Sequence, residues 1–528
     1  MAEPQTGAGL LLGTLADAGV ETCFANPGTS EMHLVAALDG EPRMRAVLTL
    51  FEGVATGAAD GYARMTDRPA ATLLHLGPGL ADGLANLHNA RRAGSPVVNV
   101  VGDHALGHKG FDAPLESDLD AVAGVVSAHV HRSVSAAWLG RDTAAAVAAA
   151  CGPPPRIATL IVPADVAWTV DPAAERGVPQ AVSPVGRGML EADGLEAAAK
   201  ALWSDEPCTL LLGGTALRGP GLRAAQRIAE ATGARLVAEC FPARMQQGAG
   251  LPRVDRLAYP GDVAERQLAG TRHLVLVGAR SPVTFFAYPG RRGDLVPEGC
   301  AVHSVSTLGA AGLTAAEALA DLVAGGVEAR PPADVERPDP PTGALTARKA
   351  AEVVGALLPE GAIVVDESVT SGYALPGALA GAPPHDVLTL TGGSIGFGPP
   401  SATGAAVARP DRPVWNLQAD GSALYSLQAL WTQAREGLDV TTVVFDNGAY
   451  AILRAELAGV GATLAADSPA RSLLDLGAPR LDFVALATGL GVPATRADTA
   501  EDLAAALRRA AAEPGPHLVA AQVPPLVP

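Results

Sequence analysis

The stretch that most constrains the fold of this chain is a pair of predicted strand runs that are each followed by polar residues. Residues 414–418 precede Asp420-Gly421-Ser422, and residues 441–445 precede Asn447, which lies 27 positions after Asp420. Residues 426–435 between the two runs have the pattern of a helix, so the segment predicts one parallel βαβ unit. Units of this kind bind ligands at the carboxyl edge of the sheet, where the two strand ends lie side by side.

The side chains expected at that edge are suited to a metal ion. A carboxylate from Asp420, an amide oxygen from Asn447 and the carbonyl of Ala449 are hard oxygen donors. Mg²⁺ prefers such donors and usually completes its octahedron with phosphate oxygens and water. The segment therefore predicts a magnesium and phosphate site, and the alternative is an ordinary Asp-Gly turn followed by a helix N-cap at Asn447.

A second strand-to-helix junction lies near the N-terminus. The largely apolar run 46–51 passes directly into Glu52, and the small residues of 53–64 predict a helix. A carboxylate in this place has a raised pKa through desolvation unless a ligand engages it. The alternative is a helix-terminal Glu that is favoured by the helix macrodipole.

Together the two stretches resemble motifs of the thiamine diphosphate (ThDP) enzymes, in the family of the acetolactate synthases and benzoylformate decarboxylases. They occur in the family's order, with about 370 residues between Glu52 and Asp420. The later stretch resembles the GDG…NN motif, although Ala419 replaces its first Gly and Asp446 its first Asn. The resemblance implies that the three oxygen donors hold Mg²⁺ against the diphosphate. It also places three more residues against the cofactor: Gly421, Ser422 and Tyr450.

The resemblance gives Glu52 the main catalytic role. In the family this Glu hydrogen-bonds N1′ of the aminopyrimidine and promotes the tautomer whose N4′ removes the proton from thiazolium C2. Ile395 matches the bulky apolar residue that bends the cofactor, and the carbonyl of Gly393 could accept a hydrogen bond from N4′. Thr370 follows a predicted strand, where hydroxyl and amide groups could receive phosphate. A plain glycine turn is the alternative for the loop at 390–398.

Two further residues match active-site positions of benzoylformate decarboxylase. Thr29 aligns with an active-site Ser, and His75 aligns with an active-site His that would shuttle protons or bind the substrate carboxylate. A structural His at a strand end is the alternative for His75. The second active-site His of that enzyme aligns with Phe285, so the proton relay is incomplete. A Phe there makes the pocket more apolar and favours carbon–carbon bond formation over protonation of the enamine.

The loop after the predicted strand 97–101 resembles a region of the acetolactate synthases. Those enzymes carry a Phe-Gln-Glu triplet there, whereas this chain has Pro114-Leu115-Glu116, which puts their substrate geometry in doubt. His104, His108 and Lys109 are candidates for a polar acceptor pocket, with His104 counted as a candidate catalytic residue. Solvated loop residues are the alternative.

We predict three doubly wound parallel-sheet α/β domains of the ThDP decarboxylase type. Their ranges are 1–172 (pyrimidine-binding), 189–330 (central) and 342–528 (diphosphate-binding), joined by Pro- and Gly-containing linkers. The central range lacks a GxGxxG motif, so dinucleotide binding is not supported there. FAD, which acetolactate synthases carry in this domain, is an open alternative that is not favoured.

Composition excludes several classes of protein. The net charge of −17 argues against nucleic acid as a partner, because no basic surplus exists to neutralise a phosphate backbone. The five cysteines lack CxxC spacing, which argues against a metal cluster or a disulfide framework. No run approaches the roughly 20 apolar residues of a membrane span, and no signal peptide is recognised, so we expect a cytoplasmic protein.

The resemblance implies a ThDP- and Mg²⁺-dependent 2-oxo acid decarboxylase or carboligase, similar to benzoylformate decarboxylase and working through an enamine. An acetolactate synthase-like carboligase and a catalytically silent ThDP-binding paralogue are the alternatives. The expected partners are a small 2-oxo acid and an aldehyde acceptor. Since the family builds each site from two subunits, a homodimer or homotetramer with active sites at the subunit interface is implied.

Overall fold

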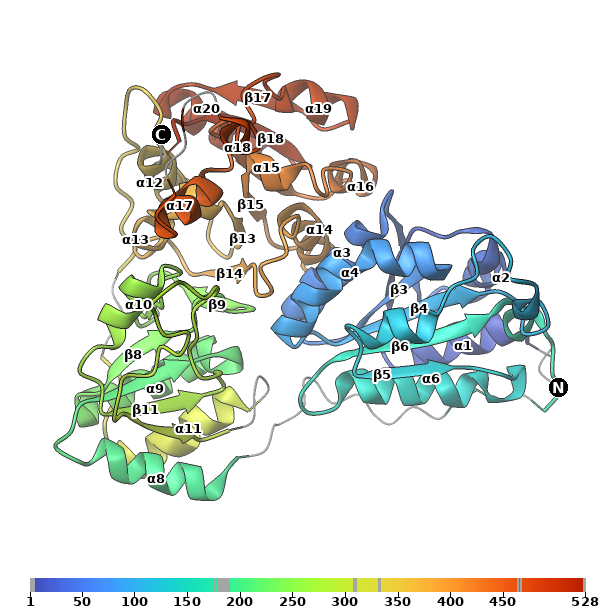
Figure 1. Cartoon of the computed structure of the whole chain (residues 1–528), viewed down its shortest axis with the longest axis horizontal. Coiled ribbons are helices and arrows are strands. Elements are labelled where there is room, and N and C mark those ends of the chain that lie inside the picture. Colours follow the sequence, from blue (N-terminus) through green and yellow to red (C-terminus); the bar gives the residue numbers. More distant parts are fainter. Residues whose placement is uncertain are drawn as a thin grey trace.

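The computed structural model describes residues 5–173, 176–177, 190–306, 311–330, 334–462, 465 and 468–525. Three α/β bodies follow one another along the chain, each built on its own sheet (Figure 1). The N-terminal body is blue to teal, the central body green to yellow, and the C-terminal body olive to red. The predicted fold class of three largely parallel sheets is confirmed.

Six parallel strands form the sheet of the N-terminal domain, in the order β2-β1-β3-β4-β6-β5. Leu73 packs on one face of this sheet and Leu74 on the other. Strands that are buried on both faces read as nearly continuous apolar runs, which explains the sequence pattern. The strands are β1 (Thr22–Ala25), β2 (Arg45–Leu48), β3 (Ala70–His75), β4 (Val97–Asp103), β5 (His129–Arg132) and β6 (Ile157–Pro163). The main helices are α1 (Gly7–Asp17) and α6 (Ala136–Cys151) on one face, and α3 (Glu52–Thr66) and α4 (Leu76–Ala93) on the other. The shorter helices are η1 (Thr29–Glu31), α2 (Met32–Ala37), η2 (Leu38–Gly40), η3 (Lys109–Phe111), α5 (Leu119–Gly124) and α7 (Ala164–Trp168).

The central domain has a five-stranded parallel sheet in the order β10-β8-β7-β11-β12. Strand β8, which follows β7 in the chain, lies on one side of β7, and the later strand β11 lies on the other side. The strand order therefore reverses between β7 and β11, and such switch points form ligand crevices. The strands are β7 (Cys208–Leu212), β8 (Arg235–Ala238), β10 (Asp255–Arg256), β11 (His273–Val277) and β12 (Ala301–Ser304). The helices are α8 (Ala192–Leu202), η4 (Gly214–Leu217), α9 (Gly219–Thr232), α10 (Gly261–Leu268) and α11 (Gly312–Val323).

The C-terminal domain has a seven-stranded sheet in the order β17-β18-β16-β15-β13-β14-β9. Its edge strand β9 (Met245–Gln247) comes from the central segment and pairs antiparallel with β14. Three residues are too few for a sequence pattern to reveal such a long-range pairing. The other strands are β13 (Ile363–Glu367), β14 (His385–Thr389), β15 (Val414–Ala419), β16 (Val440–Asp446), β17 (Ala494–Ala497) and β18 (His517–Gln522). The helices are α12 (Ala347–Leu357), η5 (Val369–Gly372), α13 (Leu375–Leu379), α14 (Gly398–Ala408), α15 (Asp420–Ala423), α16 (Ala429–Glu436), α17 (Ala451–Gly459), α18 (Pro469–Ser472), α19 (Phe483–Gly489) and α20 (Ala500–Ala512).

The N- and C-terminal domains meet where α3 packs against α14. A Cβ at Gly61 would collide with the carbonyl of Ser401, and a Cβ at Gly404 would collide with the carbonyl of Ala58. Glycine is required at both positions because the two helix backbones approach so closely. No helix in the part of the chain that the structure describes is long and apolar enough to cross a membrane.

Candidate active site

The ends of β15 and β16 meet as predicted, and Asp420 joins them. Its Oδ1 accepts a hydrogen bond from the backbone N–H of Gly421 at 2.8 Å. Its Oδ2 accepts from the N–H groups of Asn447 (3.0 Å) and Gly448 (2.7 Å) across the crevice. One buried carboxylate thus fixes the loop after β16 relative to the end of β15.

The electrostatics of this edge favour a cation. Burial raises the pKa of Asp420 to about 6, and the neighbouring Asp446 adds to the increase. Asn447 presents its amide next to this carboxylate, with its Oδ1 accepting from the N–H of Ala449 at 2.9 Å. A carboxylate after β15, with an amide oxygen and a backbone carbonyl from the loop after β16, forms a donor set that fits Mg²⁺.

Gly421 and Ser422 shape the floor of this edge. A Cβ at Gly421 would collide with the Tyr450 ring, so only glycine lets Tyr450 lie over the strand end. The Ser422 hydroxyl accepts a hydrogen bond from Gln418 Nε2 at 2.6 Å and donates to the carbonyl of Ala419 at 3.2 Å. The Ser422 hydroxyl is therefore hydrogen-bonded to residues at the end of β15.

Strained backbone borders the same edge at η5. Val369 has φ +50°, which is unusual for a β-branched residue. Thr370 follows it, and the hydroxyl of the next residue, Ser371, accepts a hydrogen bond from Asn447 Nδ2 at 3.4 Å. Strain of this kind costs of order 1–3 kcal/mol and persists where the surroundings impose it, as they do at ligand sites.

The loop that carries Gly393 and Ile395 is held by side chains from another domain. Asn89 on α4 donates to the carbonyl of Ser394 at 2.8 Å and accepts from its N–H at 3.2 Å. Asn86 on the same helix donates to the carbonyl of Gly396 at 3.3 Å. The N-terminal domain thus fixes the conformation of a loop that the C-terminal domain supplies.

Glu367, the last residue of β13, also holds the loop that carries Gly393 and Ile395. Its carboxylate accepts from the N–H groups of Gly396 (2.7 Å) and Gly398 (2.6 Å) and from Gln418 Nε2 (3.0 Å). Burial raises the pKa of Glu367 to about 7, although these three donors favour the ionised form. The carboxyl at the end of β13 therefore sets the position of Ile395.

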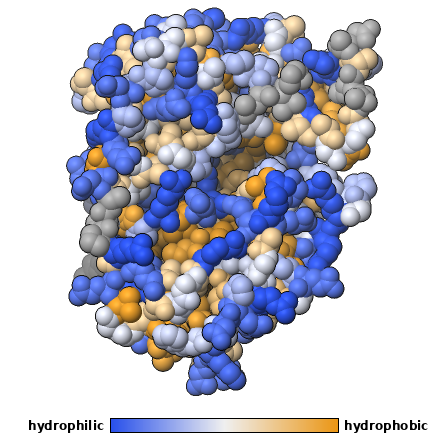
Figure 2. All heavy atoms as spheres, turned by 90° about the vertical axis from the view of Figure 1, so that its left-hand side faces the viewer, coloured by the Kyte–Doolittle hydropathy of each residue, from blue (hydrophilic) through white to orange (hydrophobic). Residues whose placement is uncertain are grey.

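Phe285 lies directly over Gly393, which has φ +74°. A Cβ on Gly393 would be 2.5 Å from Cζ of Phe285. The ring belongs to an aromatic cluster, with centroids 5.4 Å from Tyr259, 5.6 Å from Phe241 and 5.4 Å from Phe286. Figure 2 shows the side of the molecule that carries the central and C-terminal domains, where apolar surface gathers in hollows between hydrophilic rims.

Glu52 begins α3, where its side chain is buried beside the first turn of α4. A Cβ added to Gly79 would lie 2.9 Å from Glu52 Oε1 and 3.3 Å from Cβ of His75. Glu52 and His75 therefore flank the same glycine.

A second carboxylate orients His75. Nδ1 of His75 lies 2.8 Å from Oε2 of Glu31 and 3.2 Å from the hydroxyl of Ser30. Glu31 is fully buried and also accepts from the N–H of Gly28 at 2.8 Å. Thr29 is exposed in the same turn. The structure thus brings Thr29, His75 and Glu52 to one edge of the N-terminal sheet.

Within one chain, Asn86 on α4 joins the surroundings of Glu52 to the loop of Gly393. Its Nδ2 donates to the carbonyl of Gly53, the residue after Glu52, at 2.8 Å and to the carbonyl of Gly396 at 3.3 Å. The carboxylate of Glu52 itself lies beside Gly79 in the first turn of α4, whereas a Cβ on Gly392 would lie 2.6 Å from Oδ1 of Asn89.

The loop after β4 forms a charged network rather than an open cluster of cations. Lys109 Nζ lies 3.1 Å from Oδ2 of Asp103 and 2.6 Å from Oε1 of Glu116. The ring of His104 lies 5.3 Å from the ring of His108, and its buried Nε2 has no hydrogen-bond partner among the described residues. The positive charge of Lys109 is therefore compensated, while His104 has one ring nitrogen available.

Family models match both ends of the chain. The model described as thiamine pyrophosphate enzyme, N-terminal TPP binding domain, matches residues 5–124, and the corresponding C-terminal TPP binding domain matches residues 377–521. IlvX of Mycobacterium tuberculosis (strain H37Rv) is 60% identical over 523 residues and covers 99% of both chains. The chain belongs to the thiamine pyrophosphate-dependent enzymes.

Other members of this ThDP family resemble the chain over nearly its whole length. The assigned name of IlvX is that of an acetolactate synthase large subunit. Benzoylformate decarboxylase of Pseudomonas aeruginosa PAO1 is 30% identical and covers 95% of this chain and 96% of its own. The structure of a ThDP-dependent 4-hydroxybenzoylformate decarboxylase from Rhodococcus jostii RHA1 superposes with a TM-score of 0.83 at 26% identity, covering 99% of this chain and all of that one.

Sequence reasoning missed the residues that hold this ThDP enzyme's site residues in place. They are Glu31, Ser30, Asn86, Asn89 and Glu367. The available signals were weak: a Ser-Glu pair that reads as a helix cap, two Asn at helical i,i+3 spacing, and a Glu at a strand end. Each signal has a common structural explanation when the fold is unknown.

Proposed function

We propose that this ThDP enzyme is a Mg²⁺-dependent 2-oxo acid decarboxylase and carboligase of the benzoylformate decarboxylase type. The observation that carries the proposal is the Glu31–His75 pair beside Glu52. A fully buried carboxylate that holds a partly exposed imidazole at the edge of a site supports proton transfer or carboxylate binding at that place. A merely structural cofactor site has no need of such a pair.

When bound, ThDP supplies a thiazolium that accepts the electrons released as a 2-oxo acid loses CO₂. Asp420, Asn447 and the carbonyl of Ala449 would hold Mg²⁺ against the diphosphate, and Thr370 lies at the border of that site. Glu52 would hold a proton at N1′ of the pyrimidine, and the carbonyl of Gly393 would accept from its amino group.

His75 would serve the substrate side of the same site. Held by Glu31, its ring can donate a proton to the reacting carbon after decarboxylation, or bind the substrate carboxylate before it. Ile395 and Phe285 would exclude water from the opposite side, since Ile395 follows Gly393 in its loop and the ring of Phe285 lies over Gly393.

The family resemblance supports a site that is built from two copies of the chain. Glu52 and Gly393 would contact one pyrimidine ring from two sides, each from a different subunit. Glu52 of one subunit would therefore face Gly393 and Asp420 of another, which makes a homodimer or homotetramer the active form.

An acetolactate synthase-like carboligase is the second candidate, because Phe285 makes the wall over Gly393 aromatic and apolar. Because the Phe285 ring cannot donate a proton, the carbanion equivalent would remain available to a second carbonyl compound. The name of IlvX also favours this candidate, whereas Pro114-Leu115 in the loop after β4 disfavours it.

Product analysis by NMR separates the two candidates. The purified protein with ThDP and Mg²⁺ is given benzoylformate or pyruvate, each with and without an added aldehyde. We expect benzaldehyde and CO₂ from benzoylformate, and a hydroxyketone when an aldehyde is present. Acetolactate from pyruvate would instead establish the second candidate, and a failure to consume either acid would reject both substrates.

A further inference from the structure

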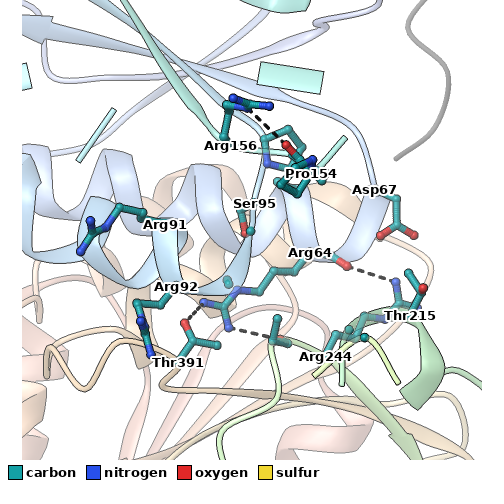
Figure 3. Close-up of a pocket in the computed structure, with 18 of the residues that line it drawn as sticks. Arg64, Asp67, Arg91, Arg92, Ser95, Pro154, Arg156, Thr215, Arg244 and Thr391 are labelled. Atoms are coloured by element: carbon teal, nitrogen blue, oxygen red, sulfur yellow. Dashed lines mark hydrogen bonds between the residues drawn. The ribbon is translucent and has the colours of Figure 1, made fainter. Parts of the chain in front are cut away.

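One guanidinium group joins the three domains of the chain. Arg64 lies in the last turn of α3, at the domain junction in Figure 3, and its side chain is only 2% exposed. Nε (2.9 Å) and Nη2 (2.6 Å) of Arg64 donate to the two carboxylate oxygens of Asp60, one turn earlier on the same helix. Asp60 is fully buried and also accepts a hydrogen bond from the hydroxyl of Ser95. A bidentate pair of this kind fixes the plane and the direction of the guanidinium.

The remaining donors of Arg64 reach the other two domains. Nη1 donates to the carbonyl of Thr389 at 2.8 Å and to the carbonyl of Ala243, which follows β8, at 3.2 Å. Nη2 also donates to the hydroxyl of Thr391 at 3.0 Å (Figure 3). The five N–H groups of the guanidinium therefore each have an acceptor, which is the full donor capacity of an arginine.

These contacts hold both ends of the loop at 390–398, which carries two of the proposed cofactor contacts. At the first end, Thr389 is the last residue of β14 and Thr391 follows it into the loop. At the second end, the ring of Phe397 lies 4.6 Å from the guanidinium carbon of Arg64, within the range of a cation–π contact. Arg64 thus restrains the loop both where it leaves β14 and where it enters α14.

Other side chains hold the middle of the loop. Asn89 on α4 and Glu367 on β13 hydrogen-bond to its backbone. Arg64 differs from them because its contacts lie at the two ends of the loop. The residues between those ends, Gly393 and Ile395, thereby have little freedom to shift. Such precision matters in an active site, where a displacement of about 1 Å can lower a rate about 10²-fold.

We propose that Arg64 is a positioning residue for activation of the cofactor, and that it acts through the two ends of the loop at 390–398. When ThDP is bound, Arg64 keeps the carbonyl of Gly393 and the side chain of Ile395 in the places that the function proposed above gives them. The proposal rests on that function, but it requires no particular 2-oxo acid. Loss of Arg64 should also loosen the loop before any cofactor is added.

Amide hydrogen exchange of the cofactor-free protein, followed by mass spectrometry of its peptides, tests this role without ThDP. The double variant Asp60→Leu/Arg64→Met removes the ion pair without leaving an unpaired buried charge. The N–H groups of Gly396 and Gly398 donate to a buried carboxylate in the unmodified protein. We expect peptides over 389–398 to exchange at least about tenfold faster in the double variant, because these groups then open to solvent more often.

Arg412→Met is the matched control. Arg412 pairs with Asp386 at 2.7 Å near the start of β14, the strand whose other end leads into the loop. Without Arg412, peptides over 389–398 should exchange within about twofold of the unmodified rate, since the contacts of Arg64 remain. Faster exchange in the double variant that is spread evenly over the chain would show a general loss of stability and would overturn the proposal.

Arg64→Lys provides a second variant, because it keeps the buried positive charge but lacks the planar fork. Its amide exchange over 389–398 should lie between the rates of the unmodified protein and the double variant. Exchange as slow as in the unmodified protein for both variants would overturn the proposal.

Hydrogen–deuterium exchange at C2 of bound ThDP gives a second readout. In the ThDP-saturated double variant, C2 exchange should be slower by about 10²-fold. The Kd for ThDP should stay within about threefold, because the oxygen donors of Asp420 and Asn447 are unchanged. Equal C2 exchange in the double variant and a fast-exchanging unmodified protein would overturn the role of Arg64 alone. Slow C2 exchange in the unmodified protein would reject the proposed function together with that role.

Discussion

Nδ1 of His75 lies 2.8 Å from Oε2 of Glu31, a carboxylate that is fully buried. The two residues come from different elements: His75 ends β3, and Glu31 ends the η1 turn after β1. Since β1 and β3 are neighbours in the sheet, their carboxyl ends bring the pair together beside Glu52. The imidazole that faces the site is thereby fixed in one orientation.

The pair predicts unequal effects of two substitutions on decarboxylation. His75→Ala should lower kcat/KM for the 2-oxo acid by about 10²–10⁴, because a positioned proton donor contributes that much. Glu31→Gln should have a smaller effect, since the ring remains but its orientation is less fixed. Steady-state kinetics would measure both, with the exposed His33→Ala as control. Equal kinetics for His75→Ala and the unmodified protein would remove His75 from the mechanism.

Metal removal should weaken cofactor binding. Chelation of Mg²⁺ by EDTA, or the substitution Asp420→Ala, should weaken ThDP binding by roughly tenfold or more, because the diphosphate then faces oxygen donors without a cation between them. Quenching of intrinsic fluorescence on ThDP titration would measure the affinity, and Asp82→Asn on the exposed side of α4 is the control. ThDP binding that is insensitive to EDTA would contradict the assigned metal site.

Mixing two inactive variants should restore activity if each site is shared between subunits. A Glu52→Gln chain supplies an intact Asp420 edge, and an Asp420→Ala chain supplies an intact Glu52. If the two kinds of chain pair at random, about half of the dimers contain one chain of each kind. Each mixed dimer has one intact site and one site that carries both substitutions. Activity should therefore reach about a quarter of the unmodified level. An assay after joint unfolding and refolding would show this gain, whereas a mixture as inactive as its parts would place both residues in one subunit's site.

Glu367 predicts a pH dependence of stability. Burial raises its pKa from an ordinary value of 4.5 to about 7. The folded protein therefore holds a proton that the unfolded chain releases, and the stabilising contribution is complete below about pH 4.5 and lost as the pH rises through 7. Glu367→Gln should remove this contribution, so that the difference in unfolding free energy between the two proteins changes between pH 5 and pH 8.

Urea unfolding at several pH values would measure that difference. A constant difference across the range would show that the Glu367 carboxyl does not titrate there. Because the carboxylate holds the N–H groups of Gly396 and Gly398, the variant should also bind ThDP more weakly through the displaced Ile395.

The sequence predicted those parts of the site that depend on neighbouring strand ends. Asp420 and Asn447 lie on consecutive parallel strands joined by one crossover, and a right-handed crossover leaves few other arrangements. Glu52 begins α3 shortly after β2 and His75 ends β3, and the structure places both beside Gly79. The family resemblance and the fold class are confirmed by the matched domains and the three sheets.

Contacts between distant segments were not predictable in this way. Asn89 holds Ser394, which is 305 positions later, and β9 joins a sheet whose other strands come from residues after 362. Such pairings depend on how whole domains pack, and no local period or turn signal records them.

The most direct test of the central claim is the rate of hydrogen–deuterium exchange at thiazolium C2 of bound ThDP, followed by NMR after acid quenching. We predict rapid exchange in the unmodified protein and a rate lower by about 10²–10⁴ in Glu52→Gln, because that carboxyl holds the proton that activates the cofactor. Equal exchange rates in the two proteins would contradict the account and leave the chain as a ThDP-binding protein without catalytic use of Glu52.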